Sequence, residues 1–170
     1  YYVWGCNFSI RKEVLLKVGG FHPDSMPDEF LRYRGDGESA VSREILNSGY
    51  KTIFNPKASV YHFVPTKRMT PDYIHKRGYI QGISDSYTSI RQSRKVDPKT
   101  AIRMSIFNQI HRFKTRVRGH ISTGMQPYDH YRSGWLKGYH YHQHEVLKDK
   151  NLFAWVLRNN YFGENGEIPK

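Results

Sequence analysis

The chain has 170 residues, enough for one domain with a hydrophobic core or for one domain with an appendage. Its 27 Lys and Arg against 15 Asp and Glu give a formal net charge of +12. This charge favours nucleic acid, an anionic membrane surface or a phosphorylated substrate as a partner, unless the basic side chains are merely solvated. A single cysteine, Cys6, excludes an internal disulfide and suits a reducing compartment, and no apolar run is long enough for a bilayer, so we expect a cytoplasmic protein.

The first residues predict a strand followed by a short helix. The run Tyr1–Phe8 begins mid-pattern and without Met, so we expect the chain to be a piece of a longer protein. Arg11–Val18 predicts a helix with Ser9 as its N-cap, ended by Gly19-Gly20. Because a truncated sheet would leave an open edge, we expect the isolated piece to self-associate as a two-fold dimer, most simply through Tyr1–Phe8.

An acidic turn, Gly35-Asp36-Gly37-Glu38, leads directly into the next predicted helix. This helix covers Ser39–Ser48, and Gly49 follows where a left-handed C-terminal residue is favoured. Carboxylates at a helix entrance commonly cap the free N–H groups, so Asp36 and Glu38 need not be more than caps. The same position on a rigid scaffold also presents reactive groups, which makes both residues candidates for chemistry.

Two β-rich segments come next, Lys51–Asn55 and Ser59–Val64, separated by Asn55-Pro56. We expect both to be strands. The second carries His62 near its end, where an imidazole can reach a site at a sheet edge or simply pack at the strand terminus.

These segments together resemble a known family. GCNFSIRKEVLLKVGGF, followed by GDGES and SREILNSGYKTIFNPKASVYH, is similar to the second half of the catalytic domain of glycosyltransferase family 2, the GT-A type nucleotide-sugar transferases. The resemblance covers residues 3–82. It implies an α/β fold class, with the acceptor-side part of a GT-A domain over residues 1–96 and a helical C-terminal extension over residues 97–170. The donor-binding half, with its Asp-x-Asp metal motif, is not in this sequence.

The resemblance also implies an inverting sugar transfer and the residues that perform it. Counted back from Gly49, Glu38 stands where the family has its catalytic Asp, and Gly37 stands where the family has a preceding Glu. This departure leaves either Glu38 or Asp36 as the base. His62 aligns with a strand-end His that approaches the metal in related enzymes, so a divalent ion, Mg or Mn, is expected in the full-length parent.

A long helix is predicted to begin at Thr70-Pro71 and to continue towards Ile90. Four basic residues accompany it: Lys67 and Arg68 just before its start, and Lys76 and Arg77 two turns along. In the resembling family, basic residues here lie near the donor diphosphate, whose developing charge Arg can accept. A solvated basic face would produce the same pattern.

The last third predicts three further helices, over Pro98–Arg118, Pro127–Leu147 and Asn151–Arg158. The first has Ile102, Ile106, Ile110, Phe113 and Val117 at helical spacing and a basic remainder. Such a helix can lie on a membrane surface, but we favour the commoner arrangement, in which it packs on its own domain.

Two classes of function follow. The favoured one is a fragment, inactive alone, of a bacterial glycosyltransferase that moves sugar from a nucleotide-diphosphate donor to a glycan or lipid-linked acceptor in polysaccharide or cell-envelope synthesis. Peripheral contact with the inner face of a membrane is compatible with it. The alternative is a basic polyanion- or nucleic-acid-binding module without catalysis, but no nucleic-acid recognition motif supports it.

Overall fold

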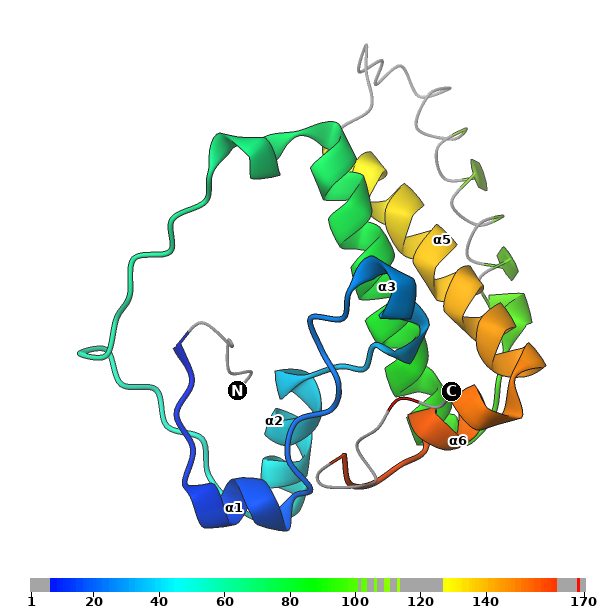
Figure 1. The fold of residues 1–170 in the computed structure, drawn as a ribbon. Helices are drawn as coiled ribbons and strands as arrows, with labels where there is room; N and C mark the ends of the chain where they lie inside the picture. Colours follow the sequence, from blue (N-terminus) through cyan, green and yellow to red (C-terminus); the bar gives the residue numbers. More distant parts are fainter. Residues whose placement is uncertain are drawn as a thin grey trace.

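The computed structural model describes residues 7–100, 102–103, 106, 109–110, 113, 127–161 and 168. Helices make up its regular structure (Figure 1). The α-helices are α1 (Lys12–Lys17), α2 (Glu38–Asn47), α3 (Pro71–Ser93), α5 (Pro127–Lys148) and α6 (Lys150–Val156), and the 3-10 helices are η2 (Asp28–Tyr33) and η3 (Thr66–Met69). None of the described helices is both long and apolar enough to cross a membrane.

A parallel pair of long helices, α3 and α5, forms the centre of the molecule (Figure 1). Four glycines line their contact: Gly78 and Gly82 on α3, and Gly134 and Gly138 on α5. A Cβ added at Gly82 would overlap the carbonyl oxygen of Trp135, and one added at Gly138 would overlap that of Tyr79. Only glycine therefore allows the two backbones to approach this closely.

A hydrophobic core joins the C-terminal part of this pair to η2 and α6. Its buried members are Tyr33, Tyr87, Ile90, Val146, Leu152, Trp155 and Val156. The indole of Trp155 is fully enclosed, and its Nε1 donates a 2.9 Å hydrogen bond to the carbonyl oxygen of Tyr33. The two rings also meet edge to face at a centroid distance of 5.7 Å. This core fixes η2, and with it the acidic turn that follows, against α3.

Most predicted helix boundaries are confirmed within a residue or two. Thr70 caps α3, because its Oγ1 accepts a 3.3 Å hydrogen bond from the backbone N–H of Tyr73. Gly49 follows α2 with a φ of +80°, the left-handed conformation that glycine adopts freely. The N-cap prediction for Ser9 is wrong: Arg11 occupies that position in α1, and no side chain caps the helix.

The predicted α/β fold class is wrong, because the described residues contain no strand. Residues 51–64, expected to supply two strands, instead run as an irregular and largely exposed segment. A strand exists only through backbone hydrogen bonds to a neighbouring strand, and among the described residues outside this segment only the side chain of Asn7 donates to it, at the carbonyl oxygen of Ala58. Of the predicted first strand, residues 1–6 lie outside the described residues, as does most of the surface proposed for a dimer, and Phe8 is not in a strand.

The predicted boundary between residues 96 and 97 stays a prediction. Across it, α3 packs along α5, and the backbone N–H of Asp97 donates a 2.7 Å hydrogen bond to Oε1 of Gln143 on α5.

Candidate functional site

The acidic turn is held between η2, α2 and α3 by its own backbone. The N–H of Gly35 donates to the carbonyl oxygen of Pro23 at 2.7 Å, and the Gly35 carbonyl accepts from the hydroxyl of Ser84 at 2.9 Å. Gly37 has a φ of +47°, and a Cβ there would lie 2.8 Å from the Asp24 carboxylate. A glutamate at position 37 would be strained in this backbone conformation, and its carboxylate would be repelled by Asp24.

Asp36 is buried and fully engaged. Its Oδ1 lies 2.6 Å from Nδ1 of His22, and its Oδ2 accepts hydrogen bonds from Arg43 at 2.7 Å and from Thr88 at 2.8 Å. Burial by itself raises the pKa of Asp36, but the hydrogen bonds from His22, Arg43 and Thr88 outweigh it and lower the pKa to about 2. Asp36 thus stays ionised and ties the turn to both α2 and α3.

This shift predicts an acid dependence of stability. The pKa of Asp36 is lowered from 3.8 to about 2 on folding, so its contribution is present above the ordinary value and is lost as the pH falls towards 2. The difference corresponds to about 2 kcal/mol. Urea unfolding of the chain should give a lower free energy of unfolding near pH 2.5 than at pH 6. In Asp36→Asn this difference should be smaller by the contribution of Asp36. A mutant with the wild-type acid dependence would contradict the assignment, as would an equal effect of Asp72→Asn, an exposed control on α3.

Glu38, in contrast, is an available carboxylate. It is the first residue of α2 and is half-buried, and its side chain forms no hydrogen bond or ion pair with any residue that the structure describes. It lies within electrostatic range of Arg34, as do Asp24 and Arg77. The turn therefore presents Glu38 at a helix start, within electrostatic range of the Arg34 guanidinium.

Arg34 is the fixed member of this group. Its guanidinium forms an ion pair with Asp24, and its Nε donates to the hydroxyl of Ser84 at 3.2 Å. Burial lowers the pKa of Arg34, Asp24 and Glu38 counteract this, and the positive charge of Arg77 adds to the lowering. Arg34 is thus already paired with Asp24, and Arg77 is a second cation within its electrostatic range that an anionic ligand could contact.

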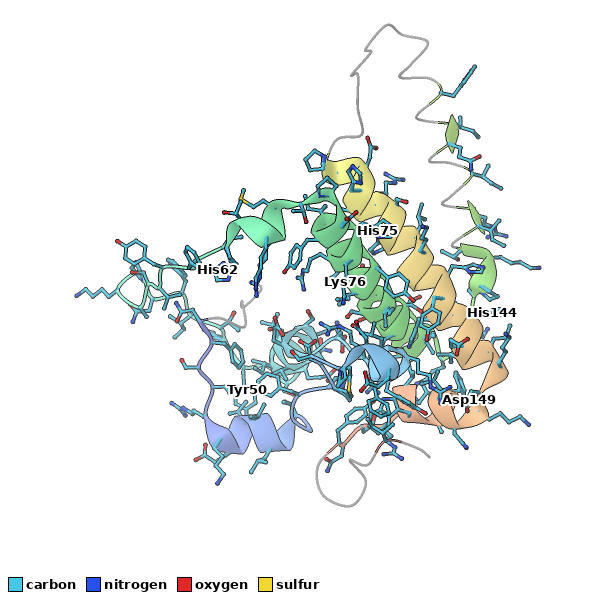
Figure 2. All side chains as sticks on the ribbon, turned by 45° about the horizontal axis from the view of Figure 1, so that its top comes forward. Tyr50, His62, His75, Lys76, His144 and Asp149 are labelled. Carbon is cyan, nitrogen blue, oxygen red and sulfur yellow. The ribbon has the colours of Figure 1, made fainter. Side chains whose placement is uncertain are left out.

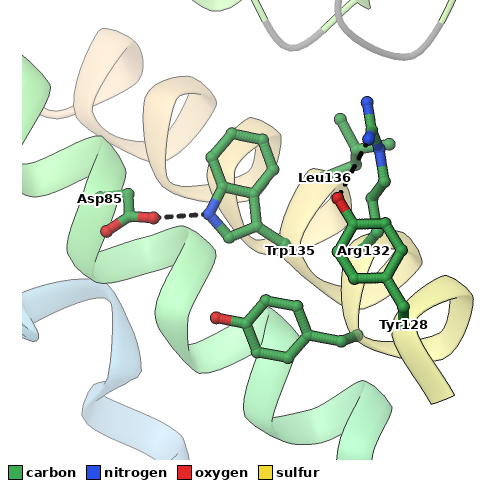
Figure 3. A pocket seen from close by; sticks show the side chains of 6 residues that line it. Asp85, Tyr128, Arg132, Trp135 and Leu136 are labelled. Carbon is green, nitrogen blue, oxygen red and sulfur yellow. Dashed lines mark hydrogen bonds between the residues drawn. The ribbon is translucent and has the colours of Figure 1, made fainter. Parts of the chain in front are cut away.

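An aromatic pocket of about 310 Å³ lies between α3 and α5. The pocket is lined by Asp85, Tyr128, Tyr131, Arg132, Trp135 and Leu136 (Figure 3). Trp135 donates a 2.6 Å hydrogen bond to Asp85. The pKa of Tyr131 is raised by burial and by the charge of Asp85, whereas the charge of Arg77 lowers it. Arg77 therefore lies within electrostatic range of Tyr131 as well as of Arg34.

The structure does not join the remaining predicted site residues to this group. Lys67 and Arg68 are exposed on η3, and Arg68 lies over the ring of Tyr73 at 5.9 Å. His62 is exposed on the 51–64 segment, outside the helical body (Figure 2). Among the described residues, no group of three or more His, Cys, Asp or Glu side chains is arranged to hold a metal ion. The residues described thus do not form a fitting metal site around His62.

The sequence interpretation missed four members of the site: His22, Arg34, Arg43 and Thr88. Arg43 lies on α2, the helix that the acidic turn enters, so its nearness in the sequence is the one local signal for its contact with Asp36. His22 and Thr88 come from a loop and a distant helix, and no local pattern joins them to Asp36.

No protein-family model matches the chain, and no curated protein or solved structure matches it significantly. The resemblance to glycosyltransferase family 2 therefore stays a prediction, and a function has to be argued from the geometry of the chain itself.

Proposed function

We propose that this chain supplies the general base and part of the diphosphate site of a transferase that moves sugar from a nucleotide-diphosphate donor to an acceptor hydroxyl. The observation that carries the proposal is Glu38, a carboxylate at the start of α2 with no hydrogen bond or ion pair among the described residues and within electrostatic range of Arg34. A glycan or lipid-linked acceptor, and a cytoplasmic location, belong to the same proposal.

In this mechanism Glu38 accepts the proton of the acceptor hydroxyl. The hydroxyl oxygen then attacks the anomeric carbon, the bond from that carbon to the diphosphate oxygen breaks, and the electron pair leaves with the diphosphate. Arg34 and Arg77 stabilise the negative charge that develops on the leaving group. The divalent ion implied by the resemblance remains a prediction for the natural protein, and no step is assigned to it.

The contrast between the two carboxylates of the turn supports Glu38 as the base. Both oxygens of Asp36 are already engaged, Oδ1 by His22 and Oδ2 by Arg43 and Thr88, and a group with a pKa of about 2 is a weak proton acceptor near neutrality. Its part in the proposal is to position the turn. Glu38 has no such partners among the described residues, so an acceptor hydroxyl can reach it.

The aromatic pocket supports a sugar as the transferred group. Tyr and Trp rings offer flat apolar faces, while Asp85 and Arg132 offer polar contacts, the combination that orients a small polar ligand in a concave site. Arg77 lies within electrostatic range of both Arg34 and Tyr131, which lines the pocket, so a diphosphate bound at Arg77 would bring its sugar near the pocket.

Nucleotide binding tests the diphosphate half of the proposal. In the natural protein, Arg77→Gln should weaken the binding of a nucleoside diphosphate roughly tenfold to a hundredfold, because a charge-assisted contact is lost. Isothermal titration with UDP, GDP and ADP would identify the nucleotide and measure the change.

Lys76→Gln is the matched control. Lys76 is the neighbouring cation on α3, but its Nζ pairs with Asp28 at 2.9 Å on an exposed surface. It should leave the affinity unchanged. No binding of any nucleoside diphosphate, or equal losses in both variants, would overturn the placement of the diphosphate.

A further inference from the structure

The segment 98–113 exposes a stripe of apolar side chains. Its described residues are all helical, beginning at Pro98, and Asp97 caps the first turn through its side chain. Four side chains share one face at positions i, i+4, i+8 and i+11: Ile102 is 52% exposed, Ile106 54%, Ile110 48% and Phe113 70%. The expectation that this face packs on the chain's own domain is therefore wrong for these four residues.

The charge of the same stretch is of one sign. Between Asp97 and Asp129 the sequence has no acidic residue, and it carries these basic residues: Lys99, Arg103, Arg112, Lys114, Arg116 and Arg118. Of these, Lys99 and Arg103 are described and are exposed. An exposed apolar stripe with flanking cations is typical of helices that lie in the plane of a membrane surface.

We propose that the exposed apolar face of the segment 98–113 binds the surface of an anionic lipid membrane. The stripe enters the boundary between headgroups and acyl chains, and the cations contact the anionic headgroups. Charge selects this partner over the others: a second copy of a chain with a net charge of +12 would be repelled. A nucleic acid would be attracted by the cations, but it offers nothing to cover three isoleucines and a phenylalanine.

The position of the segment is compatible with such binding. Its described residues run beside α5, which lies between them and α3 in both views (Figures 1 and 2). Glu38 and Arg77 belong to α2 and α3, so a membrane bound through this segment leaves the candidate site open. The inference does not depend on the proposed function.

Flotation of the full chain with vesicles tests the inference. Vesicles of phosphatidylcholine with about one-third phosphatidylglycerol should bind the wild-type chain, and pure phosphatidylcholine vesicles should bind it at least tenfold more weakly. Molar salt should weaken the binding to the anionic vesicles. Ile106→Asn/Ile110→Asn should reduce binding roughly tenfold or more, because it removes the inserted face. Lys99→Gln/Arg103→Gln, which removes the two exposed cations described on the segment, should reduce it by a similar factor.

The matched control is Phe54→Ser/Phe63→Ser, which removes two side chains that are each 83% exposed on the 51–64 segment. This variant should bind as the wild type does. Circular dichroism melts establish that each variant is folded, which is expected because the substituted isoleucines are half exposed.

Three results would overturn the inference. The first is no binding to anionic vesicles, and the second is loss of binding in the Phe54/Phe63 control with retention in the isoleucine variant. The third is that the isoleucine variant binds both anionic vesicles and duplex RNA as tightly as the wild type does. Binding would then depend on charge alone, and the segment would be a general polyanion-binding surface.

Discussion

Replacing Gly82 by alanine should lower the free energy of unfolding by about 2–4 kcal/mol, although the same change stabilises most helices. A Cβ at this position would overlap the Trp135 carbonyl oxygen and lie 2.7 Å from the backbone nitrogen of Tyr139. Both are backbone atoms of α5 and cannot rotate away. The helices must separate instead, which loosens packing along their shared face.

Urea unfolding followed by circular dichroism measures this effect. Gly138→Ala should behave alike, since its Cβ would overlap the carbonyl of Tyr79 from the opposite helix. Gln92→Ala, on an exposed position of α3, should change stability by no more than about 0.5 kcal/mol. If Gly82→Ala were as stable as the wild type or more so, α3 and α5 would not be in backbone contact.

This helix pair also marks what local sequence patterns predict and what they miss. Thr70-Pro71 and Gly49 predict helix boundaries well, because capping and left-handed conformations are decided within a few residues. Gly78 and Gly82, read locally, only weaken a helix. Their structural role is to allow close contact with α5, whose Gly134 and Gly138 lie on the same interface, and no local sequence pattern contains that pairing.

The failed strand predictions have a related cause. Residues 51–64 have the composition of strands, with Ile53, Phe54, Val60 and Phe63 among them, but β-propensity describes a fit to a neighbouring strand rather than an intrinsic preference. Without a partner among the described residues, the same side chains remain exposed.

The candidate site was predicted in outline only. The sequence placed two carboxylates at the start of α2 but could not distinguish them. Their roles differ because His22, Arg43 and Thr88, from three different parts of the fold, converge on Asp36 and leave Glu38 unpaired among the described residues.

Glu38→Gln should reduce the rate of sugar transfer in the natural protein about a hundredfold to ten-thousandfold, with unchanged affinity for the nucleoside diphosphate. The substitution keeps the shape of the side chain and removes its ability to accept a proton. Initial rates at saturating donor and acceptor measure the loss, and titration calorimetry checks the affinity.

Asp36→Asn is the informative comparison for this result. It should lower stability, because it weakens the contacts with His22 and Arg43, but a folded sample should retain transfer within roughly tenfold of the wild type. If Asp36→Asn abolished transfer while Glu38→Gln did not, the base would be Asp36.

Chemical rescue tests the role of Glu38 most directly. Glu38→Ala in the natural protein should be nearly inactive, and the account predicts that formate or acetate restores transfer in proportion to the concentration of the added carboxylate, because a small base then occupies the vacated space. Chloride at equal ionic strength should restore nothing. Full activity of Glu38→Ala without any addition, or equal rates with chloride and acetate, would contradict a general base at Glu38.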